Sequence, residues 1–214
     1  QTFSVKSVYK QQFGSVDFVK IEKQTVFSGD SFQIKHIFSI EDPGGLIQNP
    51  KIVWEAGLKP TEKNISEDRQ YSSAIINQGG TVSNYTIGAG INDSLETTYL
   101  PGTTNWIAVR NKYFISSIIF KEPLEFAVIS GKNRVFAEKE ETFPVFNISG
   151  GRASLPANNI VACDMYIGPL DIDLVRETET NLEETMNFGW KILHPISKGI
   201  LWLLKQAYLI IPNY

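Results

Sequence analysis

The stretch "SFQIKHIFSI" (residues 31–40) shows most clearly how this chain folds. One phase of its alternation carries apolar side chains and a histidine: Phe32, Ile34, His36, Phe38 and Ile40. The other phase is mostly polar and holds Gln33, Lys35 and Ser39. Successive side chains of a β-strand point to opposite faces of its sheet. This period of two therefore predicts a strand with one buried face and one face in water.

The same alternation recurs through residues 1–167, with Gly, Pro, Asn and Asp between the apolar runs. We predict further strands at 3–9, 16–21, 52–58, 71–76, 82–87, 104–109, 113–120, 124–129, 135–138, 143–148 and 160–167. Turns are predicted between them, among others at "LPGTT" (100–104), "SGKN" (130–133) and "SGG" (149–151). About a dozen short strands indicate a mainly β chain folded as a sandwich of two sheets.

The composition excludes several classes of protein. The 214-residue chain is long enough for one large β domain, and its net charge of −3 argues against a nucleic-acid-binding protein. Its single cysteine, Cys163, excludes an internal disulfide framework and is predicted to be a small buried residue within a strand. The chain opens on Gln1 without a signal-like segment, and nowhere do about 18 apolar residues follow one another. We therefore expect the water-soluble part of a longer protein.

Catalytic chemistry has little support in the sequence. The chain has two histidines, His36 and His194, and neither lies in a recognisable catalytic or metal-binding motif. His36 falls in the inward phase of its strand and is interpreted as a core histidine with a satisfied hydrogen bond. His194 precedes Pro195 and is interpreted as a cap on the carbonyls at a helix end. We therefore predict no catalytic residue, no metal site and no cofactor.

Beyond residue 168 the pattern becomes helical. The segment "GPLDIDLVRETETNLEETMNFGW" (168–190) is acidic, and Thr180 is followed three positions later by Glu183. This spacing forms a capping box, so we predict a helix that starts near residue 180. Gly189 and Pro195 should interrupt it, because proline lacks the amide hydrogen and clashes with the preceding turn. Two short helices are therefore expected.

The tail "HPISKGILWLLKQAYLIIPNY" (194–214) predicts an amphipathic helix. Its apolar face is broad, and Trp202 lies beside Lys198 and Lys205 at the polar edge. An indole and long lysine stems suit the boundary between acyl chains and headgroups. The longest apolar run, residues 199–204, is too short to cross a membrane. The helix is expected to lie either on a membrane surface or on the β domain.

This division predicts a β domain at residues 1–168 and a helical segment at residues 169–214. The residues predicted to meet the membrane interface, or to couple it to the β domain, are Trp190, Lys191, Lys198, Ile200, Leu201, Trp202, Leu204, Lys205 and Tyr208.

Several motifs carry a family resemblance. The segments "MNFGW" (186–190), "HPISKGILWLLK" (194–205) and "IPNY" (211–214) resemble the region before the second transmembrane helix of bacterial YidC membrane-protein insertases. "TTNWIAVRNKYFISSII" (103–119) is similar to the tryptophan-containing strand pair of that family. "MYIGPLDIDLV" (165–175) is similar to the hydrophobic Gly-Pro segment that leads into the family's acidic helix.

The resemblance implies the large periplasmic domain between the first and second transmembrane helices of such an insertase. Its fold would be a β-supersandwich resembling that of galactose mutarotases, followed by short C-terminal helices. Its role would be non-enzymatic support, or chaperoning, of protein insertion and folding at the bacterial inner membrane. The implied partners are the lipid surface, the transmembrane core of the same insertase, Sec translocon components and nascent membrane proteins.

Two alternatives stay open. One is a periplasmic carbohydrate- or ligand-binding β-sandwich, whose cleft would carry aromatic side chains together with paired acids and amides. The other is an aldose epimerase-type enzyme, which needs a histidine and a glutamate in the cleft. His36 is the single histidine of the β region, so the sequence gives little support to the enzyme.

Overall fold

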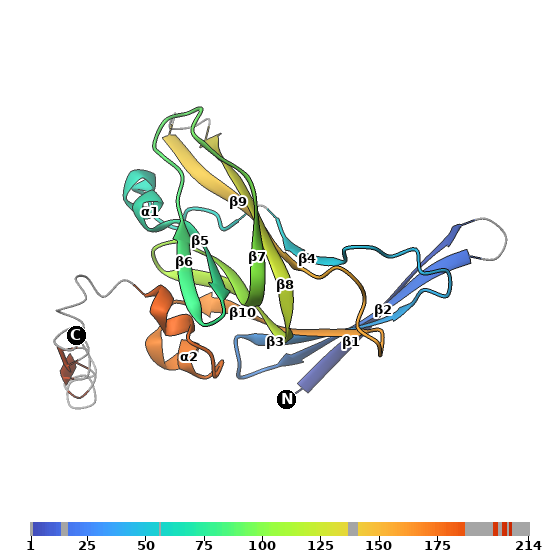
Figure 1. Cartoon of the computed structure of the whole chain (residues 1–214). Coiled ribbons are helices and arrows are strands. Elements are labelled where there is room, and N and C mark those ends of the chain that lie inside the picture. The colour runs from blue at the N-terminus through green and yellow to red at the C-terminus, as the bar shows by residue number, and fades with distance from the viewer. Residues whose placement is uncertain are drawn as a thin grey trace.

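The computed structural model describes residues 2–13, 17–55, 57–136, 141–186, 199–200, 203–204 and 206. Its strands are β1 (Thr2–Phe13), β2 (Asp17–Ser28), β3 (Gln33–Glu41), β4 (Lys51–Trp54), β5 (Ser73–Gln78), β6 (Thr81–Tyr85), β7 (Ser94–Arg110), β8 (Phe114–Phe136), β9 (Glu141–Gly151) and β10 (Ile160–Pro169). Three short helical elements follow or interrupt them: α1 (Ile65–Tyr71), α2 (Ile172–Arg176) and a 3-10 helix (Leu182–Thr185). The described residues of the tail, 199–200, 203–204 and 206, are also helical. The described chain is therefore mainly β, as predicted (Figure 1).

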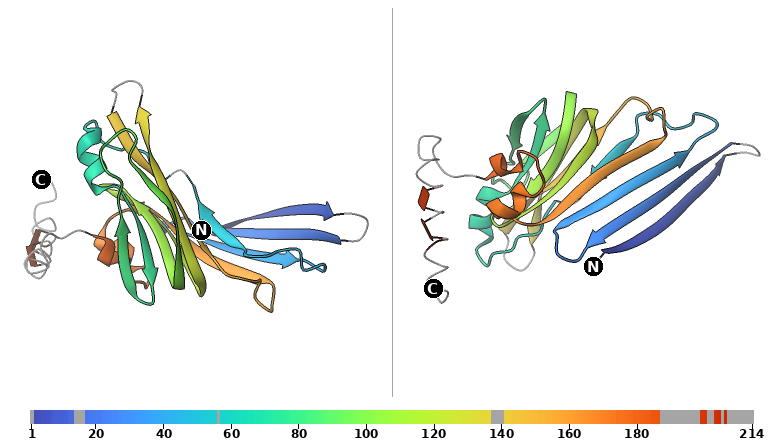
Figure 2. Two further views of the ribbon diagram at one scale, coloured as in Figure 1. Left: turned by 45° about the horizontal axis from the view of Figure 1, so that its top comes forward. Right: turned by 90° about the horizontal axis from the view of Figure 1, so that it is seen from below.

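Hydrogen bonds join the strands into one antiparallel sheet. Its order is β1-β2-β3-β10-β8-β7-β5-β6, while β9 pairs with β8 and β4 pairs with β9. Figure 2 shows β1 and β2 at one end of the molecule and β5 and β6 at the other. We refer to β1, β2 and β3 together as the wing.

The long hairpin of β7 and β8 takes part in two layers. Residues 106–110 of β7 pair with the first half of β8, which also pairs with β10. Residues 94–101 of β7 pair with the second half of β8, which also pairs with β9. The register shifts between these halves, where Gly102 has a φ of +138°. Bulges bend strands and let them pass from one layer of a sandwich to the other. The architecture is thus consistent with the predicted sandwich, with hydrogen bonds continuing from layer to layer.

An inner hydrophobic cluster fills the space between the layers. It includes Ile76 of β5, Ile107 of β7, Ile118 of β8 and, from the opposite layer, Phe146 and Ile148 of β9. All five side chains are buried. The inner cluster therefore holds the two layers together.

A second, outer cluster lies on the other face of the same strands. Ile75 and Trp106, which follow the opposite phase of β5 and β7, pack with Tyr166 of β10. Val175 of α2 and Leu182 of the 3-10 helix complete the cluster and are fully buried. Both faces of these central strands are therefore covered, one by the second layer and one by helices.

The alternation of residues 31–40 is confirmed from Ile34 onward, because Gln33, predicted to face water, is half-buried like Ile34. Ile34, His36, Phe38 and Ile40 are half-buried, while Lys35 and Ser39 are exposed. Phe32 departs from the pattern because it precedes the strand. It is exposed, and its ring centroid lies 6.2 Å from that of Tyr166, a residue of the outer cluster.

Three of the predicted turns are wrong, because "LPGTT" lies within β7, "SGKN" within β8 and "SGG" within β9. The predicted strands at 113–120, 124–129 and 135–138 accordingly overlap the single strand β8, and residues 137–138 lie outside the described part of the chain. Packing explains two of the glycines. A Cβ atom at Gly150 would lie 2.6 Å from the ring of Phe120, and one at Gly151 would lie 2.5 Å from the ring of Phe126. These positions need glycine because aromatic rings occupy the space of a side chain.

The helical elements also differ from the prediction. The residue patterns above do not predict α1, although Asn64 and Glu67 have capping spacing and the Asn64 side chain accepts a hydrogen bond from the Glu67 amide (3.2 Å). The helix expected near residue 180 is replaced by α2, capped by Asp171, and by the later 3-10 helix. The capping box does not form, since Thr180 Oγ1 accepts from the amide of Leu182 (3.3 Å). The division at residue 168 stays a prediction.

We predict that Gly150→Ala lowers the free energy of unfolding by about 1–3 kcal/mol, because the new methyl group overpacks against Phe120. Urea denaturation measures the change. Adding Phe120→Leu should recover part of the loss, and Phe120→Leu alone is the control. Equal stability of Gly150→Ala and the parent chain would contradict this account of the glycine.

Candidate functional site

The helical segment after β10 is fixed to the outer face of the sheet at its 3-10 helix. Asn181 precedes this helix, and its Oδ1 accepts hydrogen bonds from Trp106 Nε1 (3.0 Å) and Asn77 Nδ2 (2.9 Å). Trp106 and Asn77 are both buried. A buried donor that loses its partner costs the full desolvation penalty. Asn181 is thus the acceptor on which both sheet donors depend.

Arg110 fixes the other end of the same helix. Its Nη1 donates to the carbonyl of Thr185, and its Nε donates to the carbonyl of Asn111 (3.2 Å). Burial lowers the pKa of Arg110 from its usual value. Arginine still keeps its charge at neutral pH, because its ordinary pKa is above 12. A charged donor therefore holds the chain where it leaves the sheet toward the tail. We call Asn77, Trp106, Arg110, Asn181 and Thr185 the helix seat.

A buried network supports the turn that carries Arg110. Asp68 of α1 is fully buried and accepts hydrogen bonds from the amides of Thr61 (2.7 Å) and Lys112 (3.0 Å). Asn111 Oδ1 accepts from the amide of Phe114 (2.8 Å). The motif at 103–119 therefore builds the hairpin end to which the helical segment is attached.

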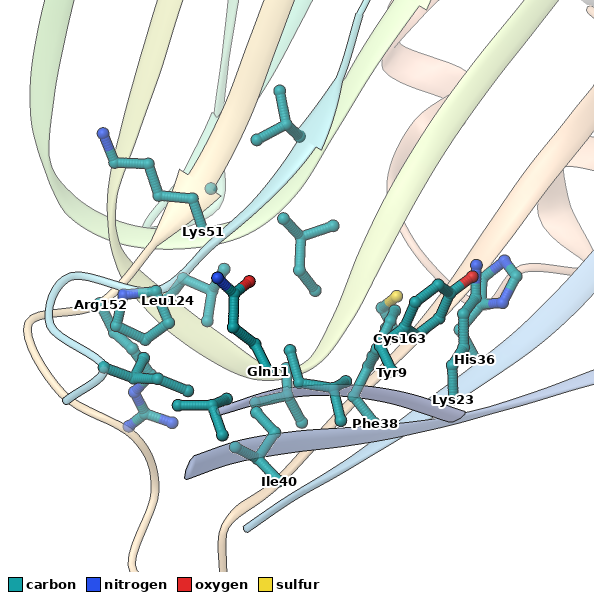
Figure 3. Close-up of a pocket in the computed structure, with 18 of the residues that line it drawn as sticks. Tyr9, Gln11, Lys23, His36, Phe38, Ile40, Lys51, Leu124, Arg152 and Cys163 are labelled. Carbon is teal, nitrogen blue, oxygen red and sulfur yellow. The ribbon is translucent and has the colours of Figure 1, made fainter. Parts of the chain in front are cut away.

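An open apolar groove is the other feature of interest. It has a volume of about 1310 Å³ and lies between the inner face of the wing and β10 on one side and β4 with its preceding loop on the other (Figure 3). Its apolar lining includes Tyr9, Val19, Ile21, Phe38, Ile40 and Ile52. Its charged lining residues are Lys10, Lys23, Lys51 and Arg152, and none of the described residues that line it is acidic.

His36 and Cys163 also face this groove. His36 Nδ1 lies 3.0 Å from Thr25 Oγ1, so its hydrogen bond is satisfied as predicted. Burial lowers the pKa of His36, and the nearby Lys23 lowers it further, so the imidazole is neutral at pH 7. Cys163 is buried, as predicted, and burial raises the pKa of its thiol to about 12. Neither group is prepared for nucleophilic or metal chemistry.

The described residues offer no further chemical centre. No group of three or more His, Cys, Asp or Glu among them is placed to hold a metal ion. In the same part of the chain, every helix is too short or too polar to cross a membrane.

Two of the residues predicted to meet the membrane or couple it to the β domain can be placed. Ile200 and Leu204 are helical and are 55% and 59% exposed. The others lie outside the described residues: Trp190, Lys191, Lys198, Leu201, Trp202, Lys205 and Tyr208. His194, predicted to cap a helix end, also lies outside them.

The sequence patterns do not find the helix seat. Trp106 and Asn181 are 75 positions apart, and no local periodicity relates them. Asn181 does stand immediately before the observed 3-10 helix, where an asparagine is a common cap. Its side chain instead accepts from the sheet, and the 3-10 helix has no side-chain cap.

Comparisons with known proteins converge on one family. The model of the YidC periplasmic domain family matches residues 9–203. The chain is 29% identical over 201 residues to the membrane protein insertase YidC of Chloroherpeton thalassium, covering 91% of this chain and 32% of that protein. It is also 29% identical over 195 residues to the YidC insertase of Chlorobium limicola, covering 88% of this chain and 30% of that protein. The chain therefore spans about a third of the length of these relatives.

We predict that Asn181→Ala lowers the free energy of unfolding by about 1–3 kcal/mol, because two buried donors lose their acceptor. Limited proteolysis should cut residues 170–186 faster than in the parent chain. The matched control is Asn84→Ala, since Asn84 is exposed on β6. Unchanged proteolysis of this segment would show that Asn181 does not hold the helix on the sheet.

Proposed function

The chain belongs to the YidC periplasmic domain family, and on that premise we propose that it is a non-enzymatic support domain of a bacterial membrane-protein insertase. The family match over residues 9–203 is the observation that carries this proposal. The domain would stand on the periplasmic side of the inner membrane. There it would support the insertion and folding of inner-membrane proteins as a chaperone module.

The helix seat supports a mechanical form of this role. Trp106 and Arg110 hold the 3-10 helix rigidly on the central strands, and the chain then continues toward the tail. A rigid attachment at Thr185 would let the β domain set the position of whatever follows it. We therefore propose that the helix seat couples the β domain to the transmembrane core of the same insertase.

We propose that the tail lies as an amphipathic helix on the membrane surface. Ile200, Leu203 and Leu204 support this, because all three are helical and more than half exposed. Burying one large apolar side chain is worth about 1.5–3 kcal/mol, whereas a lysine near anionic lipid contributes about 1 kcal/mol. The apolar face would therefore supply most of the affinity, and Lys198 and Lys205 would set the orientation. Sec translocon components and nascent membrane proteins are the further partners of this proposal.

The alternative of carbohydrate binding gains no support from the groove. A sugar site needs paired acids and amides among its aromatic side chains, and the described lining of this groove contains no acid. The epimerase alternative needs a carboxylate beside His36. The hydrogen-bond partner of its Nδ1 is instead the hydroxyl of Thr25.

The membrane proposal predicts that the 214-residue chain cosediments with vesicles containing anionic phospholipid. Replacing Ile200 and Leu204 together by glutamate should lower the bound fraction at least about tenfold, because apolar burial is lost and the new charges repel the surface. Deleting residues 195–214 should lower the bound fraction at least as far as the glutamate pair does.

The matched control replaces Ile91 and Val135 by glutamate. These residues are exposed like Ile200 and Leu204 but belong to the β domain, Val135 to β8 and Ile91 to the loop between β6 and β7. Equal binding of the tail variant, the tail deletion and the parent chain would refute the interfacial helix. The family assignment rests on the match over residues 9–203, so failure of this assay would leave it in place.

A further inference from the structure

The groove exists because the second layer of the sandwich covers only part of the sheet. β9 and β4 close the inner cluster over β5, β7 and β8, whereas the wing extends past them. Side chains on the inner face of the wing therefore stay partly open to solvent: Phe38 and Ile40 are half-buried, and Tyr9 is 63% exposed. Contiguous apolar surface of this kind marks a binding site more often than it marks bare surface.

The described charged residues that line the groove are all basic, although the chain as a whole is acidic. Four basic residues line it, and its described lining contains no acid, against a net charge of −3 for the whole chain. Among the described residues, Lys10, Lys23 and Lys51 form no ion pair. Each instead lies over an aromatic ring, and Lys23 Nζ is 5.6 Å from the centroid of Phe38. Such ammonium groups are available to an anion.

Arg152 is the basic lining residue that has carboxylates near it. Glu122 lies 3.5 Å and Glu125 4.0 Å from its guanidinium, and the side chains of both glutamates are largely exposed. These are long, solvent-screened contacts. Figure 3 shows Lys51 and Arg152 at one end of the groove and Lys23 with His36 at the other. Positive charge is therefore present at both ends of an apolar floor.

The apolar floor limits the chemistry of an occupant. An extended peptide would bring backbone amides and carbonyls into a site whose lining is mostly hydrocarbon, and unpaired polar groups are costly there. An acyl chain has no such groups. The volume of about 1310 Å³ also exceeds the roughly 300–1,000 Å³ of ordinary small-molecule pockets. The groove thus suits a long hydrocarbon chain that ends in an anionic group.

We propose that the groove binds an anionic phospholipid. The acyl chain would lie on the inner face of the wing, and the phosphate would contact the basic side chains at the ends of the groove. The apolar floor of Tyr9, Phe38 and Ile52 would take the hydrocarbon, and Lys23 and Lys51 would select the anionic headgroup. This inference is argued without the tail, because all the described groove residues precede residue 195.

The test measures binding of palmitoyl lysophosphatidylglycerol to the 214-residue chain by isothermal titration below the micelle concentration. We expect one lipid per chain, bound at least about tenfold more tightly than palmitoyl lysophosphatidylcholine. Raising the salt concentration should weaken binding of the anionic lipid alone. Palmitate and an alanine–leucine helical peptide are tested in parallel.

Variants locate the site. Lys23→Gln with Lys51→Gln should weaken binding of the anionic lipid at least about tenfold, at roughly fivefold per lysine. The matched control is Lys35→Gln with Lys132→Gln, which removes the same charge outside the groove. Tyr9→Asp should weaken binding of both lipids, whereas Phe3→Asp, at an equally exposed position of the same strand outside the groove lining, should not.

Replacing Ile200 and Leu204 by glutamate should leave this binding unchanged, which separates the groove from the tail. Equal affinity for the two lipids would overturn the proposal, as would equal loss in the groove and control lysine pairs. Tighter binding of palmitate would identify a free fatty acid, and tighter binding of the helical peptide would identify a polypeptide ligand. Either result would also overturn it.

Discussion

The central strands carry apolar side chains in both phases, and the whole architecture follows from the need to cover both of their faces. On β5 and β7, Ile76 and Ile107 point to the inner cluster while Ile75 and Trp106 point to the outer one. A single sheet in water would leave one of these clusters exposed. The free-energy cost of that exposure would be about 25 cal/mol for each Å² of apolar area. The bent β7–β8 hairpin brings a second layer over the inner face. The helical segment after β10 covers the outer face. The helices are thus part of the fold's core, although only a short stretch of chain forms them.

The wing shows the contrary case. Its strands mostly alternate, so one face is largely apolar and the other largely polar, and the second layer does not reach across the apolar face. Ile40 and Phe38 are half-buried for this reason, whereas Ile107 on β7 is buried completely. One continuous hydrogen-bonded sheet therefore supplies both a closed core and an open groove. The inner faces of both parts are apolar, and the second layer of β9 and β4 covers one of them and not the other.

Local patterns predicted the fold class well because strands are encoded by neighbouring residues. The alternation in residues 34–40 matches the observed burial, whereas Gln33 is half-buried like Ile34. Glycine wrongly predicted a turn where tertiary packing is the reason for the residue. Gly150, for example, makes room for the ring of Phe120, which another strand contributes. The helix seat could not be predicted for a related reason. Asn181 accepts a hydrogen bond from Trp106, which is 75 positions away in the sequence, and no local pattern around either residue predicts this contact. The tail residues were proposed from amphipathic spacing, and Ile200 and Leu204 are the two of them that the structure describes.

Because the β7–β8 hairpin is continuous through both layers, it would determine how the domain responds to a pulling force. If the membrane pulls on the chain beyond Thr185, the force enters the sheet at Arg110, next to the closed end of that hairpin. The same two strands then run through both layers, so tension is shared along many parallel hydrogen bonds rather than concentrated on one interface. The layers would therefore resist sliding against each other, and the domain would follow its anchor as a stiff lever. Deformation would be expected first in the wing, which lies off this line of force.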